Sequence, residues 1–124
     1  MSNQQRRLIP VYTTRGDVGG YLAYPNIYNR QGEWIGWVTP EREVYSVHGA
    51  YVGYMTNDPR VLRKVSDSFD RPAKDPPSRP SRILPPPTVP LPAMMPELLQ
   101  GVIDVFDDDP DLLQPIDYGG KDLD

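Results

Sequence analysis

Three successive segments of this chain share one pattern, and this internal repeat limits the possible folds more than any other feature of the sequence. The pattern is an aliphatic residue and a tyrosine, three residues, a glycine, three residues, and then glycine, an aromatic residue and an aliphatic residue. The segments occupy residues 11–22, 27–38 and 44–55. A nearly constant period of this kind indicates a fold built from equivalent units.

Each unit is predicted to form a β-hairpin. Tyrosine, tryptophan, valine and isoleucine favour strands. The first glycine of each unit closes a short loop, where hairpins often need a positive φ. The second glycine stands inside a strand, which is unfavourable unless another segment approaches the backbone closely. We therefore expect neighbouring units to meet at these second glycines, which are Gly20, Gly36 and Gly53.

A fourth unit is incomplete. Residues 60–64 repeat the aliphatic pair but lack the second half of the pattern. The apolar pair Leu8-Ile9 precedes the first unit and could supply the missing strand. Eight strands would then close a ring in which the N-terminal and C-terminal strands pair.

The repeat resembles the four-fold beta-flower family over about residues 8–64. The resemblance rests on Gly32-x-x-x-Gly36-Trp37 and Gly49-x-x-x-Gly53-Tyr54, preceded by Ile27-Tyr28 and Val44-Tyr45. It implies a small bacterial all-β domain in which four hairpins surround a pseudo-fourfold axis. Some members look distantly like Tubby-type and scramblase-type domains, which suggests lipid contact by analogy alone.

The two halves of the chain differ in composition. Only 4 of the 16 prolines precede residue 65, whereas 9 of the 12 aromatic residues do. Residues 1–64 carry a net charge of +3, and residues 65–124 carry −7. We therefore expect an all-β hairpin-repeat domain over residues 1–66, a disordered proline-rich linker over 67–96, and an acidic tail with a short amphipathic helix over 97–124.

The proline-rich segment favours an extended polyproline II conformation. Two stretches fit the PxxP pattern, residues 77–80 and 87–90. Such matches are frequent by chance where proline is abundant, so a semi-rigid spacer is preferred to a docking motif.

Apolar residues after the prolines recur at helical spacing and predict one face that could dock on the same chain, on a second copy or on another protein. Gly101 and the aspartates that follow weaken this helix, so it needs a surface on which to form. The face comprises Met95, Leu98, Leu99, Val102, Ile103 and Phe106.

The residues that catalysis and metal binding require are scarce. The chain has no cysteine, which excludes disulfides and thiolate metal sites. Its one histidine, His48, is expected on a surface turn. The aspartates at 104–111 do not fit the spacing of a calcium-binding EF-hand loop. We predict no enzyme activity, no cofactor and no metal.

Aromatic and basic residues of the repeat are the candidates for contact with a ligand or partner. They are Trp34, Trp37, Tyr51, Tyr54, Arg30, Arg60 and Arg63. The preferred hypothesis is a non-enzymatic adaptor that binds protein partners through the repeat domain and the acidic tail. The alternative is a lipid or small-ligand binding module. A net charge of +3 is too small to favour nucleic acid.

No run of apolar residues is long enough to span a membrane, and the polar N-terminus does not resemble a signal peptide. The expected location is therefore the cytoplasm.

Overall fold

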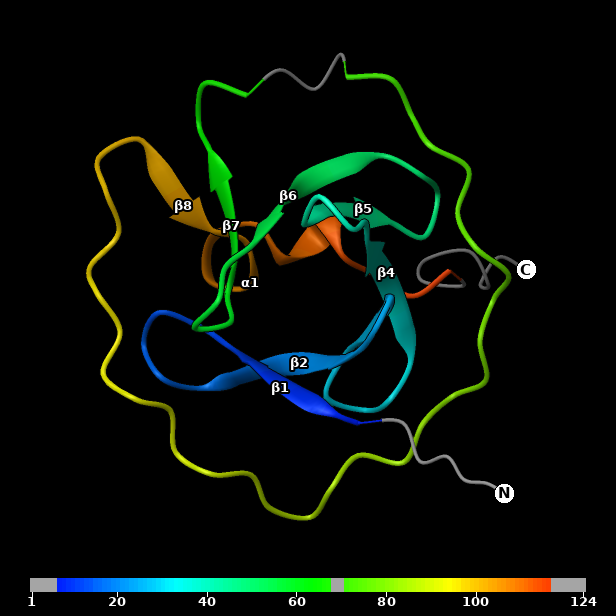
Figure 1. Cartoon of the computed structure of the whole chain (residues 1–124), viewed down its shortest axis with the longest axis horizontal. Coiled ribbons are helices and arrows are strands. Elements are labelled where there is room, and N and C mark those ends of the chain that lie inside the picture. Colours follow the sequence, from blue (N-terminus) through cyan, green and yellow to red (C-terminus); the bar gives the residue numbers. More distant parts are fainter. Residues whose placement is uncertain (1–6, 68–70, 117–124) are drawn as a thin grey trace.

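The computed structural model of the 124-residue chain describes residues 7–67 and 71–116. Eight antiparallel strands form one curled sheet in which each strand pairs with the next along the chain (Figure 1). This confirms the predicted all-β hairpin repeat. The strands are β1 (Ile9–Tyr12), β2 (Val18–Ala23), β3 (Asn26–Tyr28), β4 (Trp34–Val38), β5 (Glu43–Ser46), β6 (Tyr51–Met55), β7 (Val61–Lys64) and β8 (Val102–Asp104).

The first three hairpins (β1–β2, β3–β4 and β5–β6) have the same loop. A polar residue at the end of the first strand, Thr13, Asn29 or Ser46, donates its N–H to the carbonyl four residues later. Its side-chain oxygen accepts the N–H of that same residue. The loop glycines have φ between 88° and 96°, as the hairpin prediction requires. These paired bonds fix the loop and explain why each unit places a small polar residue three positions before glycine.

The second glycine of each unit lies against the next hairpin, as expected. A Cβ added to Gly36 would lie 2.6 Å from the carbonyl oxygen of Tyr45 in β5. A Cβ on Gly20 or Gly53 would collide in the same way with the carbonyl oxygen of the facing strand. Only glycine allows the backbones of neighbouring hairpins to approach so closely.

The fourth hairpin is completed from the C-terminal part of the chain. β7 pairs with β8, with Leu62 opposite Asp104 and Lys64 opposite Val102. The expectation that Leu8-Ile9 would supply the partner of β7 is wrong, because Ile9 belongs to β1 and faces Leu22. Gly101, with φ +82°, precedes β8 as the loop glycines precede β2, β4 and β6.

A short helix near the C-terminus is confirmed, although its limits differ from the expected ones. Helix α1 spans Val105–Asp108 and is followed by the 3-10 helix η1 (Pro110–Leu112). Residues 102–104 form a strand instead of a helix, because the positive φ of Gly101 interrupts a helix and β7 offers unpaired backbone groups. The carboxylate of Asp104 caps α1 by accepting the N–H of Phe106.

The proline-rich segment runs around the outside of the sheet (Figure 1). Residues 71–100, here called the belt, contain no helix and no strand. The belt was expected to be a spacer between two separate parts. It is instead part of a long insertion in the fourth hairpin, because β7 and β8 at its two ends are paired with each other.

The belt meets the loop glycines of the first three hairpins in turn. The N–H of Lys74 donates to the carbonyl of Gly49, and the N–H of Ile83 donates to that of Gly32, both at 3.0 Å. Pro92 lies beside Gly16, where proline has no N–H to donate. These positions are nine residues apart (74, 83 and 92), and nine residues further on stands Gly101.

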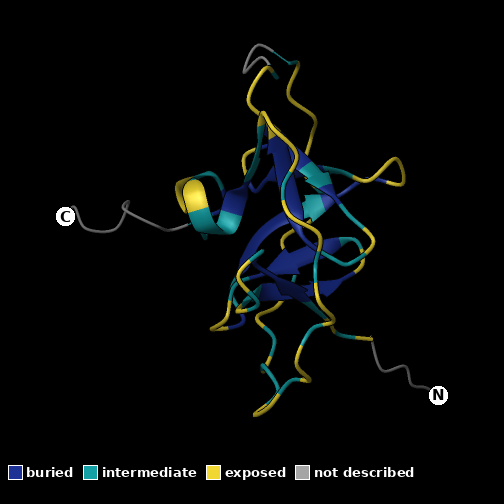
Figure 2. Ribbon diagram, turned by 90° about the vertical axis from the view of Figure 1, so that its left-hand side faces the viewer, coloured by how far each residue is buried: buried dark blue, intermediate teal, exposed yellow. Residues whose placement is uncertain are grey.

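The hydrophobic core lies inside the curled sheet and draws on both ends of the chain. It contains one or two aliphatic residues from each of β1 to β7. Val105 and Leu113 join them from residues 102–116, here called the C-terminal segment. Phe106 and Leu112 pack against its edge. Figure 2 shows that the buried residues concentrate in the strands, while the exposed ones lie mostly in the loops outside them.

Side chains close the gap between the fourth and the first hairpin. The backbone N–H and the hydroxyl of Thr14 both donate to Asp104 Oδ2, at 2.7 and 2.6 Å. Arg60 in turn donates to the Thr14 hydroxyl at 3.0 Å. Burial of the Asp104 carboxyl raises its pKa above the ordinary value, and the bonds from Thr14 oppose that shift.

Among the residues that the structure describes, no helix has the length and apolar character needed to cross a lipid bilayer.

Candidate functional site

The four aromatic residues singled out from the sequence are all buried or half-buried in the structure. Trp34 and Tyr51 are buried, and Trp37 and Tyr54 are half-buried. The Trp37 indole N–H donates to the carbonyl of Ser46 at 3.1 Å. The Trp37 ring stacks on the Tyr45 ring, with 5.0 Å between the ring centres. These contacts give the Trp37 ring a structural role.

The three candidate arginines are not brought together on one surface. Arg30 is exposed on the loop of the second hairpin. Arg60 is buried and bonds Asp58, Thr14 and the belt carbonyl of Pro96. Arg63 is also buried and donates to the carbonyl of Val52 at 3.1 Å. A basic rim would need exposed guanidinium groups, and two of these three are occupied inside the fold.

A cluster of charged and aromatic side chains anchors the start of the belt on the third hairpin. Glu43 accepts hydrogen bonds from Arg71 at 2.7 Å and from the Tyr45 hydroxyl at 3.0 Å. The Arg71 guanidinium lies 3.8 Å from the centre of the Tyr51 ring, a cation–π contact. The hydrogen bond from Arg71 holds the pKa of Glu43 below its ordinary value of 4.5, although burial opposes this shift. The cluster therefore fastens the belt by charge as well as by backbone bonds.

Further contacts hold the belt along its length. Arg82 donates to the carbonyl of Gln31 at 3.0 Å and lies 3.9 Å from the Glu33 carboxylate. The Tyr12 hydroxyl donates to the carbonyl of Pro90 at 2.6 Å. The belt is thus attached at each of the four hairpins, counting the bond from Arg60 to Pro96.

The outer side of the belt displays large apolar side chains. Leu84 and Leu91 are each 91% exposed, and Met94 is 97% exposed. Pro87 and Pro90, the prolines of the second PxxP stretch, are exposed between them, whereas Pro77 and Pro80 of the first are half-buried. In a chain with three residues per turn, Leu84, Pro87 and Pro90 share one side, and Leu91 and Met94 share a neighbouring side. We call these five residues the outer strip: Leu84, Pro87, Pro90, Leu91 and Met94.

The residues predicted to form one docking face of a tail helix are separated by the structure. Val102 and Ile103 lie in β8, and Phe106 packs against the core. Met95 and Leu98 are half-buried at the end of the belt, and Leu99 is 78% exposed. Three of the six residues are therefore engaged within the chain, in β8 or at the core, and the six do not form one helical face.

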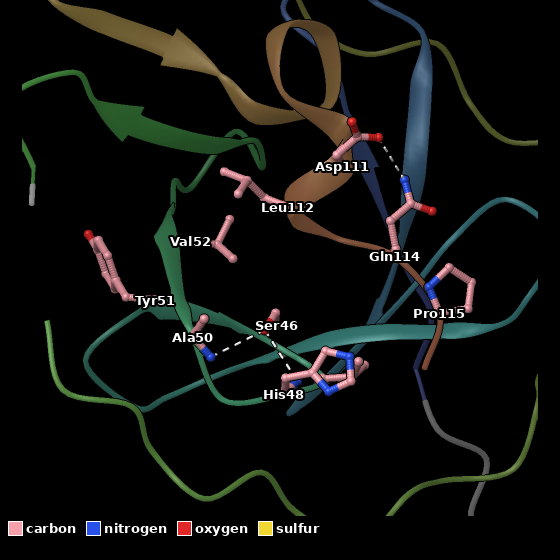
Figure 3. A pocket seen from close by; sticks show the side chains of 10 residues that line it. Ser46, His48, Ala50, Tyr51, Val52, Asp111, Leu112, Gln114 and Pro115 are labelled. Carbon is pink, nitrogen blue, oxygen red and sulfur yellow. Dashed lines mark hydrogen bonds between the residues drawn. The ribbon is translucent and has the colours of Figure 1, made fainter. Parts of the chain in front are cut away.

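A pocket of about 340 Å³ lies between the third hairpin and the C-terminal segment (Figure 3). Val52 and Leu112 line it together with Ser46, His48 and Gln114. The Ser46 hydroxyl accepts the backbone N–H groups of His48 and Ala50 at 3.2 Å, so it holds the loop. His48 is exposed on that loop.

The described part of the chain contains no group of three histidine, cysteine, aspartate or glutamate side chains placed to hold a metal ion.

Sequence reasoning missed the outer strip and the return of the chain to β7. One signal was available for each. Phe106 follows Gly101 by five residues, which repeats the spacing from the loop glycine to the aromatic residue in the other hairpins. The proline-rich stretch contains leucine and methionine residues that an extended chain cannot all bury. Their presence indicated an exposed apolar surface.

A family model described as "4-fold beta flower protein" matches residues 9–98. No curated protein and no solved structure matches the chain.

Proposed function

Because the chain belongs to the 4-fold beta flower family, a family of repeat folds, we propose that it is a non-enzymatic interaction module that presents the outer strip of its belt to a protein partner. The hairpin repeat serves as the scaffold on which the belt is stretched. A cytoplasmic location, expected from the sequence, is part of the same proposal.

The observation that carries the proposal is the exposure of three large apolar side chains on a segment fixed at both sides. Leu84 and Leu91 are 91% exposed, and Met94 is 97% exposed. The backbone bond from Ile83, the bond from Tyr12 to Pro90 and the bond from Arg60 to Pro96 hold the chain before, between and after these side chains. A segment already held extended loses little conformational entropy on binding.

The chemistry of the outer strip fits a partner with a groove lined by aromatic side chains. Such grooves bind extended proline-rich segments and accept apolar side chains between the prolines. The proposal assigns less of the partner contact to the acidic tail than the sequence suggested, because Val102, Ile103 and Phe106 are engaged in β8 and at the core. The anionic-lipid alternative is weakened in the same way by the burial of Arg60 and Arg63.

The proposal is tested by affinity capture from a lysate of the source cell with three purified forms of the full chain. The first is the unchanged protein, and the second carries Leu84→Ser, Leu91→Ser and Met94→Ser. The third is a matched control with Asp75, Ser78 and Thr88, which are exposed polar belt residues, changed to alanine. We expect a protein that the unchanged and control forms capture and the serine form loses.

A nuclear magnetic resonance spectrum of each form establishes that its fold is intact before capture. Capture of the same proteins by all three forms would contradict a role for the outer strip.

A further inference from the structure

Three equivalent positions of the repeat line one pocket. They are Leu22, Val38 and Met55, each six residues after the loop glycine of its hairpin, and all three belong to the core cluster. The fourth equivalent position, six residues after Gly101, is Asp107, which lies in helix α1. The repeat therefore supplies three aliphatic side chains here, and the fourth hairpin supplies none.

These three side chains form the floor of a pocket of about 310 Å³. Its rim comes from two turns that join successive hairpins. Tyr24 lies in the turn between β2 and β3, and Thr39, Pro40 and Arg42 lie in the turn between β4 and β5. Tyr24 is 57% exposed, so its ring stands at the rim and is not part of the core.

Among the described residues that line this pocket, Arg42 is the only charged one. Its backbone N–H donates to the carbonyl of Thr39 at 2.8 Å, and its side-chain Nε donates to the carbonyl of Met55 at 2.9 Å. These two bonds hold the backbone of Arg42 and the Nε of its side chain beside the pocket. Within the described residues, the two Nη atoms of its guanidinium have no hydrogen-bond partner.

We propose that this pocket binds a small amphiphile with an anionic head, such as a medium-chain carboxylate. The apolar body would lie on Leu22, Val38 and Met55, and the head would accept hydrogen bonds from the Nη atoms of Arg42. The pocket volume is at the lower end of the range for small-molecule sites, and an apolar floor with one convergent charged group is typical of them. Hydrogen bonds between a guanidinium and a carboxylate are among the stronger ones in proteins. The site is separate from the outer strip, since no belt residue lines it.

The methionines provide a direct test in the full-length protein. With ¹³C-labelled methionine methyl groups, Met55 reports on the pocket floor, and Met94 on the belt is an internal control. The probes are octanoate, octan-1-ol and octylammonium, which share an alkyl chain and differ in charge. We expect octanoate to shift the Met55 signal saturably, leave Met94 unchanged, and bind roughly tenfold more tightly than octylammonium.

Two substitutions at Arg42 separate the charge from the fold. Arg42→Asn suits its φ of +71° and removes the charge, so it should abolish the preference for octanoate. Arg42→Lys keeps a cation and should retain part of the preference. Arg30→Asn is the control, because Arg30 is exposed on a loop and does not line the pocket.

The inference is overturned if octanoate leaves Met55 unshifted up to its solubility limit. It is also overturned if Met94 shifts in parallel with Met55, or if the three probes bind equally to the unchanged protein. A preference for octanoate that survives in Arg42→Asn would overturn the role of the guanidinium.

Discussion

Glycine stands at two positions in each of the first three hairpins, and the two positions answer different physical demands. The loop glycines adopt a positive φ, which residues with a Cβ rarely do. The second glycines have no such requirement and are instead needed because a facing carbonyl lies where a Cβ would be. A substitution to alanine therefore tests two different costs at the two positions.

We expect Gly36→Ala to destabilise the protein by about 2 kcal/mol, a typical cost of forcing extra atoms into a packed interior. The new Cβ would lie 2.6 Å from the carbonyl oxygen of Tyr45 and 2.8 Å from Leu113 Cδ2. Gly16→Ala is the matched control, because its Cβ would meet nothing closer than 3.8 Å and only its φ of +96° is unfavourable. Urea denaturation measures both changes. A smaller loss of stability for Gly36→Ala than for Gly16→Ala would contradict the close approach of the second and third hairpins.

At the scale of elements, the belt is the feature that most distinguishes this chain from a simple hairpin repeat. Its attachment combines backbone bonds to loop carbonyls with the ion pair between Arg71 and Glu43. Because the pKa of Glu43 is lowered in the folded protein, the ion pair contributes stability above about pH 4.5, the ordinary pKa of a glutamate. That contribution is lost as the pH falls through the lowered pKa.

Glu43→Gln should therefore loosen the start of the belt at neutral pH and remove part of the acid sensitivity of that region. The measurement is the hydrogen-exchange protection of the Lys74 amide, which donates to the carbonyl of Gly49. In the unchanged protein we expect protection to fall below about pH 4.5, and in Glu43→Gln to be low already at neutral pH. Glu41→Gln is the control, since Glu41 is exposed and forms no ion pair among the described residues. Equal protection in the unchanged and Glu43→Gln proteins would show that the backbone bonds alone hold the belt.

The elements differ in how far the sequence could predict them. The first three hairpins follow from local pattern, because each carries its own loop glycine and its own pair of strands. The fourth could not be assembled in this way, since β7 and β8 are separated by residues 65–101 and meet only in the folded chain. Val102 and Ile103 fit the apolar face of a helix as well as a β-strand, and pairing with β7 decides between them.

The residues of the candidate site could likewise be predicted only in part. The sequence named Trp34 and Tyr51 as candidates for contact with a ligand or partner, and the fold buries both side chains. The exposure of Leu84, Leu91 and Met94 depends on how the belt turns against the sheet, which proline content alone does not determine.

At the scale of the whole molecule, the C-terminal segment completes a fold that the repeat leaves open. Val105 is fully buried, and Leu113 is 4% exposed. Burial of one such side chain contributes about 1.5–3 kcal/mol. Two of them amount to a large part of the roughly 5–15 kcal/mol by which a domain is usually stable. The bonds from Thr14 to Asp104 add the closure of the ring.

The most direct test of this account is the nuclear magnetic resonance spectrum of residues 1–66, recorded alone and with a peptide of residues 99–116. We predict that residues 1–66 alone give a poorly dispersed spectrum, and that the peptide restores the signals that β1–β7 show in the full chain. A control peptide carrying Val105→Asp and Leu113→Asp should have no effect. If residues 1–66 alone already give the signals of the full chain, the C-terminal segment is not needed to complete the fold, which contradicts the central claim.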